Sequence, residues 1–151
     1  MGFVQEFYDW YWNRFADKAD DLRFDIRTLP SVETVLKNRP FVLSSKLRLL
    51  LSHEERQMKI THEIGNLDFD PFWGNQDAQG KYIVDQVSVT ENRCEATILQ
   101  GTYREGSLVA QLEKNGSKWQ FANFRYSYYS EDGKTKQFPD QDLIEILSRK
   151  N

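Results

Sequence analysis

The dipeptide Asn115-Gly116 constrains the fold of this chain more than any other feature of the sequence. Both residues accept the positive φ that a two-residue hairpin turn requires, and apolar and polar residues alternate on either side of them. The pattern predicts an antiparallel hairpin that joins a strand at 108–114 to a strand at about 118–129. The second strand holds large rings at both odd and even positions, namely Trp119 and Phe121, and then Phe124, Tyr126 and Tyr128. We therefore expect it to be central in a sheet, with aromatic residues on both faces.

The hydrophobic period changes between the two halves of the chain. Apolar residues recur three or four positions apart over 3–15 and again from Ser44-Ser45 to Met58, which predicts two helices, the second capped by one of the serines. Leu29-Pro30-Ser31 starts a shorter helical piece that runs to Leu36. Apolar and polar residues then alternate over 82–90 and 94–103, which predicts two further strands.

These elements predict one α+β domain over residues 1–151. Helices occupy about 3–60, and a structured loop of turn formers and core-anchored aromatic rings occupies 65–80. An antiparallel sheet occupies 82–138, and Pro139-Asp140 introduces a short terminal helix at 140–149. We expect the N-terminal helices to pack on a strongly curved antiparallel sheet.

Composition and charge exclude several classes of protein. The net charge of −3 gives no general affinity for nucleic acid, which requires a clustered basic face. Cys94 is the only cysteine, so an intrachain disulfide and a Cys-rich metal site are both excluded. No apolar run reaches the roughly 18 residues of a membrane-spanning helix, and no export leader is recognised. We expect no cofactor and no membrane span.

Several short motifs, in their order and spacing, resemble the DUF3828 family of bacterial proteins. The motifs are Phe7-Tyr8-Asp9-Trp10-Tyr11, Leu43-Ser44-Ser45-Lys46-Leu47, Leu67-Asp68-Phe69-Asp70-Pro71-Phe72 and Asn75-Gln76-Asp77. The likeness covers residues 3 to about 128, and its most specific part is the Asp-Pro-Phe loop. It implies a fold similar to nuclear transport factor 2 and the cystatin-like cone, in which helices close one side of a bent sheet.

The same resemblance carries implications for function and location. Members of the family are mostly of unknown function, so the resemblance supplies no catalytic residues. Many members are periplasmic or lipid-anchored, which implies an exported protein, although this sequence shows neither a leader nor a lipid-anchor cysteine. Without the resemblance, the expected location is the cytoplasm.

The second strand of the hairpin and the 65–80 loop hold the candidate ligand-binding residues. An aromatic pocket in which one cation orients an acidic or carbonyl ligand could be formed by Trp73, Arg125, Tyr126, Tyr128 and Tyr129. The alternative interpretation is that these rings belong to the core and that Arg125 pairs with a carboxylate. Aromatic residues interleaved with arginine also occur in nucleic-acid-binding proteins, but the acidic balance of the chain disfavours that class.

Four polar residues of the loop follow the spacing of a calcium site. Asn66, Asp68, Asp70 and Asp77 stand at its first, third, fifth and twelfth positions. Pro71 occupies the position that requires glycine, and the last ligand is Asp in place of Glu. We therefore expect no metal, and we interpret Asp68 and Asp70 as loop carboxylates that cap backbone N–H groups or contact a ligand.

Two further acids and both histidines are candidates for proton transfer. Asp9 on the first helix and Asp85 on a strand could each act as a general base if burial in a cone-shaped pocket raised its pKa. The alternative is a solvated or ion-paired carboxylate. His53 and His62 are nine positions apart, which matches no zinc spacing, so we expect both on the polar side or at the end of a helix.

The leading hypothesis is a non-catalytic module that binds a small molecule or a protein through the concave sheet face or the Asp-Pro-Phe loop. It rests on the many aromatic residues and on the lack of a reaction motif. One alternative is an enzyme with an Asp general base in a cone pocket, by analogy with similar folds. Another is an inhibitor or immunity-type protein, marked by an exposed apolar patch. A homodimer that buries the open sheet face is a further hypothesis.

Overall fold

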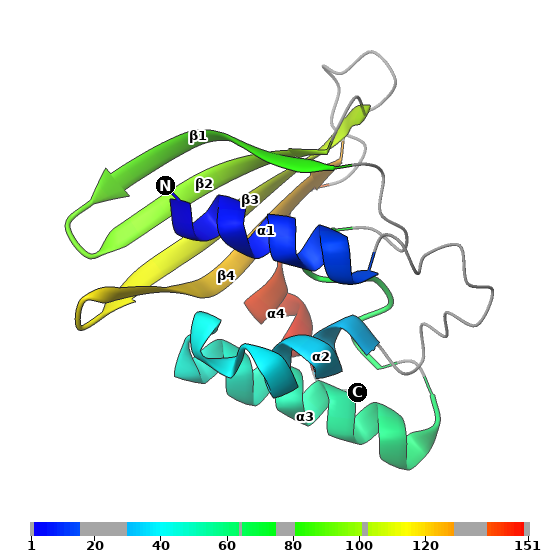
Figure 1. Cartoon of the computed structure of the whole chain (residues 1–151). Coiled ribbons are helices and arrows are strands. Elements are labelled where there is room, and N and C mark those ends of the chain that lie inside the picture. Colours follow the sequence, from blue (N-terminus) through cyan, green and yellow to red (C-terminus); the bar gives the residue numbers. More distant parts are fainter. Residues whose placement is uncertain are drawn as a thin grey trace.

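The computed structural model describes residues 2–15, 30–63, 65–74, 81–100, 103–128 and 139–149. In chain order its elements are α1 (Gly2–Phe15), α2 (Pro30–Asn38), the 3-10 helix η3 (Pro40–Val42), α3 (Ser45–Thr61), β1 (Tyr82–Thr90), β2 (Arg93–Gln100), β3 (Tyr103–Asn115), β4 (Lys118–Tyr128), β5 (Gln141–Asp142) and α4 (Leu143–Leu147) (Figure 1). The predicted fold class is confirmed, because helices pack with an antiparallel sheet and a short helix ends the chain.

The sheet is a simple meander of the order β1-β2-β3-β4-β5, and each strand is antiparallel to its neighbour. It stays open, with β1 at one edge and the two-residue β5 at the other. The predicted hairpin is confirmed, but its two-residue turn lies one position later than predicted. Asn115 pairs with Lys118, so the turn residues are Gly116 and Ser117, and Gly116 has a φ of 65°. The expected central strand, β4, lies between β3 and β5, but β5 covers only Arg125 and Tyr126.

A β-bulge in β4 changes which aromatic residues share a face of the sheet. Asn123 and Phe121 pair with consecutive residues of β3, so Ala122 is an extra residue that shifts the alternation by one. Phe121 and Phe124 therefore lie on the same face, with ring centroids 5.2 Å apart. The prediction that they face opposite ways was wrong because strict alternation assumes an unbroken ladder. We call this face, with Leu108, Ala110, Phe124 and Tyr126, the inner face, and the opposite one the outer face.

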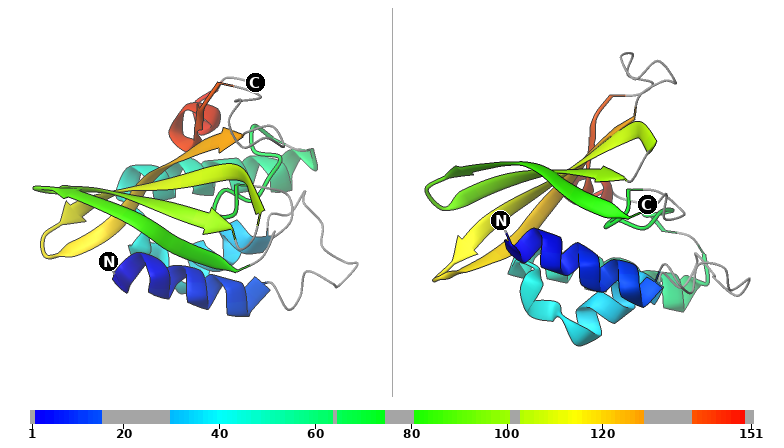
Figure 2. Two further views of the ribbon diagram at one scale, coloured as in Figure 1. Left: turned by 90° about the horizontal axis from the view of Figure 1, so that it is seen from above. Right: turned by 45° about the horizontal axis from the view of Figure 1, so that its top comes forward.

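The first helix packs against the inner face of the sheet (Figure 2). Val4, Phe7, Tyr8 and Tyr11 are buried, and their spacing of three or four, with one adjacent pair, forms the apolar stripe of an amphipathic helix. The ring of Phe7 contacts those of Phe72 and Phe121, at centroid distances of 5.6 and 4.9 Å. The core therefore joins α1 to the loop before the sheet and to β4.

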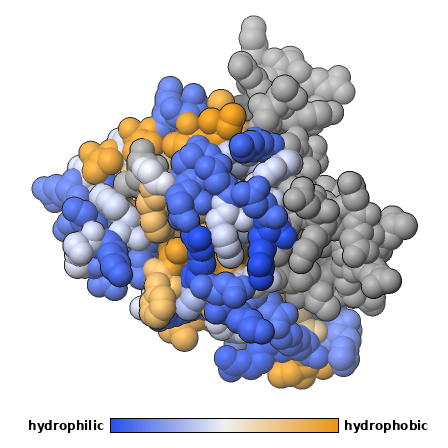
Figure 3. Space-filling model, viewed as in Figure 1, coloured by the Kyte–Doolittle hydropathy of each residue, from blue (hydrophilic) through white to orange (hydrophobic). Residues whose placement is uncertain are grey.

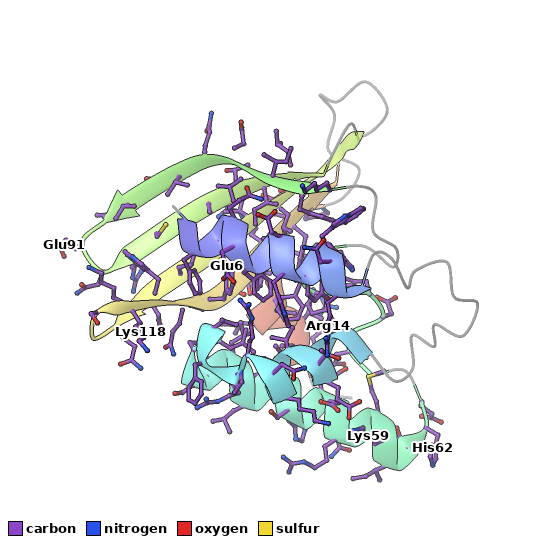
Figure 4. All side chains as sticks on the ribbon, in the orientation of Figure 1. Glu6, Arg14, Lys59, His62, Glu91 and Lys118 are labelled. Carbon is purple, nitrogen blue, oxygen red and sulfur yellow. The ribbon has the colours of Figure 1, made fainter. Side chains whose placement is uncertain are left out.

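Hydrogen bonds fix the start of α3 and the start of η3. Ser44 caps α3, as predicted: its hydroxyl accepts a hydrogen bond from the N–H of Leu47 at 3.3 Å, and its own N–H donates to the carbonyl of Phe121 at 2.8 Å. Glu6 on α1 accepts two hydrogen bonds from Arg39 Nη1, at 2.8 and 2.9 Å, which tie α1 to the start of η3 (Figure 4). In the described part of the chain, no helix is long and apolar enough to cross a membrane.

Candidate functional site

The loop that precedes the sheet is held by tyrosine hydroxyl groups from three different elements. We call residues Asp70–Gly74 the anchored loop. Three of its consecutive carbonyl oxygens each accept a hydrogen bond: Pro71 from Tyr126 at 2.7 Å, Phe72 from Tyr8 at 2.8 Å and Trp73 from Tyr82 at 3.2 Å. The donors come from β4, α1 and β1. The anchored loop therefore links α1 to β1 and to β4, the first and the fourth strand of the sheet.

The side chain of Asp70 caps this loop from within the core. It is only 2% exposed, and its Oδ1 accepts hydrogen bonds from the N–H groups of Phe72 at 2.9 Å and Trp73 at 3.2 Å. Its Oδ2 accepts a hydrogen bond from the hydroxyl of Tyr11. Both oxygens are thus used to hold backbone and core, which agrees with the interpretation of Asp70 as a capping carboxylate.

The Tyr8 phenol stays protonated at neutral pH. Burial, and then the neighbouring Tyr82 and Asp70, raise the pKa of the Tyr8 phenol well above its usual value. A neutral phenol donates one hydrogen bond, and Tyr8 donates its own to the carbonyl of Phe72. The cluster is therefore built to fix a loop in place, and its Tyr8 hydroxyl is a poor source of protons for chemistry.

The structure brings three of the predicted ligand-binding residues together and separates a fourth. Trp73 and Tyr126 are buried beside Asp70, and the Trp73 ring lies 4.4 Å from Tyr11 and 4.5 Å from Tyr82 between ring centroids. Arg125 precedes Tyr126 in β4 and therefore points to the outer face. The backbone of Tyr128 belongs to β4, but its side chain lies outside the described residues, as do the whole of Tyr129 and of Asp77.

Arg125 belongs instead to a row of polar side chains across the outer face. Its Nη1 lies 3.7 Å from Glu95 Oε1, and the same oxygen accepts a hydrogen bond from Gln111 at 3.2 Å. Asn123 donates to Gln111 at 3.1 Å and accepts from the N–H of Ile144 at 3.0 Å. This contact with Glu95 corresponds to the alternative interpretation of the sequence, in which Arg125 pairs with a carboxylate and does not bind a ligand.

The remaining acids and histidines are dispersed over the surface. Asp68 is exposed while Asp70 is buried, so these two carboxylates do not converge as calcium ligands. Asp9 is partly buried and accepts a hydrogen bond from Gln5 at 3.1 Å, and Asp85 is exposed. His53 and His62 are both exposed, with His62 at the end of α3 (Figure 4). Within the described ranges, no three His, Cys, Asp or Glu residues are grouped closely enough to hold a metal ion.

The free side of the edge strand β1 was not singled out by the sequence. Near its start, the side-chain amide of Gln5 donates to the carbonyl of Tyr82 at 3.2 Å and accepts from the N–H of Val84 at 2.9 Å. Beyond Val84 the whole strand is exposed, including Val87 at 37% and Val89 at 56%. We call residues Gln86–Thr90 the open edge. Figure 3 shows apolar surface along β1, in the upper part of the view.

Three further large apolar side chains are exposed on η3 and α3. They are Phe41, Leu49 and Ile60. Leu49 and Ile60 are eleven positions apart, about three helical turns, so they lie on the same side of α3. The sequence predicts helix at both positions. Both residues are apolar and lie on the solvent side of that helix, and this was the signal that could have indicated exposed apolar side chains.

The fold and the surface define an α+β protein with a tightly hydrogen-bonded aromatic core and exposed apolar groups on one edge strand and one helix. No family model, no curated protein and no solved structure matches this chain. The resemblance to the DUF3828 family stays a prediction.

Proposed function

We propose that this protein is a non-catalytic module that binds another protein through the open edge of β1. The observation that carries the proposal is the exposure of every residue from Gln86 to Thr90, two of them valines, on the side of β1 that pairs with no strand of the described residues. Most proteins blunt such edges, because free backbone groups beside apolar side chains attract other strands. Gln5 covers only the first part of this edge.

The burial of the aromatic cluster supports protein binding over the binding of a small molecule. Trp73, Tyr126 and Asp70 are nearly inaccessible, and Tyr126 and Asp70 make hydrogen bonds to the anchored loop. A ligand would have to displace these contacts from a packed core. Burial also raises the pKa of the Cys94 thiol, which keeps it in its unreactive protonated form.

An inhibitor or immunity-type protein is one kind of protein-binding module that fits the same surface. Exposed apolar side chains are the mark expected of that class, and they occur at the open edge and again at Leu49 and Ile60. The open edge is the better candidate because it offers backbone hydrogen bonds in addition to apolar contact.

A cone-shaped fold of the nuclear transport factor 2 and cystatin-like kind, and membership of the DUF3828 family, belong to the same proposal. Their support is the order of elements, helices first and then an antiparallel meander, with α1 packed on the inner face. The motifs of the anchored loop add to it, since Asp70 and Pro71 take part in the hydrogen bonds that hold the loop.

The test compares two matched double variants in affinity capture from cells of the source organism. Val87→Lys/Val89→Lys places two charges on the open edge, and Leu49→Lys/Ile60→Lys makes the same change on α3. All four side chains are exposed, so both variants should keep the wild-type melting temperature within a few degrees. We expect a protein that the wild type and the α3 variant retain and that the β1 variant loses.

The captured protein is then purified and titrated against the same three chains by calorimetry. We expect a loss of affinity of at least about tenfold for the β1 variant. Loss of binding in the α3 variant alone would move the site to α3. If no protein bound the purified wild-type chain, protein binding itself would be wrong.

A further inference from the structure

The backbone of the open edge is arranged to accept another strand. The backbone N–H of Val84 points away from β2, because it donates a hydrogen bond to the side chain of Gln5. Val84, Val87 and Val89 pair with every second residue of β2, so their N–H and C=O groups all face the same way, outward from the sheet. Val87 and Val89 are exposed, so their outward N–H and C=O groups are accessible to another strand.

The contacts of Gln5 show which backbone groups of this edge another chain could bind. Its carboxamide donates to Tyr82 and accepts from Val84, the two hydrogen bonds that one residue of a neighbouring parallel strand would make. The bulge at Asp85 separates this covered part from the rest. From Gln86 to Thr90 the ladder with β2 is regular, so the open edge has the geometry of an ordinary strand.

From these features we infer that the open edge binds an extended segment of another protein as an added antiparallel or parallel strand, with basic residues at both ends of that segment. This inference rests on the proposed function and names its mode of binding and the chemistry of the partner. Val87 pairs with buried Ala96 and therefore lies on the inner side of the sheet, as does Val89. The partner should place apolar residues beside them and small polar residues beside Ser88.

The charges at the two ends of the open edge specify the rest of the partner. Residues 86–90 carry no charge, whereas Asp85 before them and Glu91 after them are both exposed acids. Figure 4 places Glu91 at the tip of the β1 to β2 hairpin, where a partner strand would pass it. Arg93 lies on β2, on the side of β1 away from the open edge. Lysine or arginine at both ends of the partner would pair with these acids.

The same charges disfavour a second copy of this chain as the occupant. The antiparallel register that pairs Val87 of each copy with Val89 of the other would place Asp85 opposite Glu91 at both ends. Like charges directly opposite each other destabilise a strand pair. This repulsion acts in the register that pairs all the residues of the two open edges, and the partner that we infer is a different chain.

The experiment is a titration of the full chain with synthetic seven-residue peptides, followed by backbone amide NMR. The first peptide is Lys-Val-Thr-Val-Thr-Val-Lys, the second replaces both lysines by glutamate, and the third is the first with alternate backbone amides methylated. We expect the first to shift the amide signals of residues 86–90 with a dissociation constant below about 1 mM. The glutamate peptide should bind about fivefold more weakly at low salt.

Two variants separate the contributions of backbone and charge. Val89→Pro removes one outward N–H at an edge position that tolerates proline, and it should abolish binding while the chain stays folded. Asp85→Lys/Glu91→Lys should reverse the preference, so that the glutamate peptide binds more tightly. The methylated peptide should not bind, because its side chains are unchanged and its edge hydrogen bonds are blocked.

Three outcomes would overturn the inference. Equal binding of the methylated peptide would mean side-chain docking in place of strand addition. A dimer in light scattering that Val89→Pro converts to a monomer would make a second copy the occupant. No binding of any peptide, with a natural partner that is still lost in Val87→Lys/Val89→Lys, would reject strand addition and leave the proposed function standing.

Discussion

The carboxylate of Asp70 is buried with three donors, the hydroxyl of Tyr11 and the N–H groups of Phe72 and Trp73. Alanine at this position removes their acceptor, so we expect Asp70→Ala to lower the free energy of unfolding by about 3 kcal/mol. Asp68→Ala changes an exposed acid two residues earlier and should alter it by less than about 0.5 kcal/mol. Urea denaturation measures both, and equal effects would contradict the role of Asp70.

Tyr8 makes the stability depend on pH in the alkaline range. Burial, and then Tyr82 and Asp70, raise the pKa of the Tyr8 phenol in the folded state, whereas a tyrosine in the unfolded chain ionises at about pH 10. Above that pH the unfolded chain releases a proton that the folded chain keeps, so the free energy of unfolding falls as the pH rises. Below the pKa of the unfolded tyrosine, the contribution of Tyr8 to the free energy of unfolding is fully present.

A denaturation series between about pH 8 and about pH 11 tests this dependence. The wild type should lose stability more steeply than Tyr8→Phe, which has no phenol to titrate at this position. The variant should also be less stable at neutral pH by about 1 kcal/mol, because the hydrogen bond to Phe72 is lost. Parallel curves for the two chains would exclude Tyr8 as the source.

Glu91 occupies a left-handed backbone conformation in the β1 to β2 turn, with a φ of 49°. A side chain is unfavourable there and glycine is not, so Glu91→Gly should raise the free energy of unfolding by about 0.5 to 1 kcal/mol. Gly116→Ala, in the other hairpin at a φ of 65°, makes the reverse change and should lower it by about 1 kcal/mol. Thermal melting of both variants checks the opposite signs.

At the scale of elements, the bulge at Ala122 decides which rings of β4 enter the core. Deleting Ala122 removes the extra residue, and Phe121, Asn123 and Phe124 then pair with Leu112, Gln111 and Ala110 in an unbroken ladder, so both rings keep the inner face. Deleting Ala122 and Asn123 together makes the two phenylalanines adjacent and turns one of them to the outer face. Both rings are fully buried, so we expect the double deletion to cost at least about 4 kcal/mol or to prevent folding, and the single deletion to cost less than about 2 kcal/mol. Circular dichroism melting measures both variants, and equal losses would contradict this role of the bulge.

Features set by neighbouring residues could be predicted from the sequence, and features set by distant contacts could not. The cap at Ser44 and the hairpin between β3 and β4 depend on a few adjacent positions, and both are confirmed, although the turn is Gly116-Ser117 in place of Asn115-Gly116. The bulge at Ala122 depends on how β4 packs against β3 and the helices. The cover that Gln5 gives to Tyr82 joins residues 77 positions apart, which no local pattern encodes.

At the scale of the molecule, the candidate site was predicted in part. The anchored loop is a structured loop with rings in the core, as the turn formers and aromatic residues around Pro71 indicated. Arg125 and Tyr126 are consecutive in a strand, so period two alone was enough to separate them onto opposite faces. The open edge required the strand order, because the alternation within 82–90 is the same for an edge strand and a central one.

Gln5 controls how much of the molecule's sheet edge is available to other chains. Replacing it by alanine would free the backbone of Tyr82 and Val84 and lengthen the exposed edge toward the start of β1. A second copy could then pair in registers that do not place Asp85 opposite Glu91. We therefore expect Gln5→Ala to self-associate more than the wild type, because long unprotected edges promote pairing between sheets.

Light scattering over a concentration series measures this effect, with Gln5→Ala/Val89→Lys as the matched control. A lysine on the edge should restore the wild-type behaviour, because a charge facing an incoming strand opposes pairing. The loss of the two hydrogen bonds to β1 and of the one to Asp9 should also lower the free energy of unfolding by about 1 to 2 kcal/mol in both variants. If the control self-associated as strongly as Gln5→Ala, the contact would lie elsewhere on the surface, and Gln5 would serve only to hold α1 against β1.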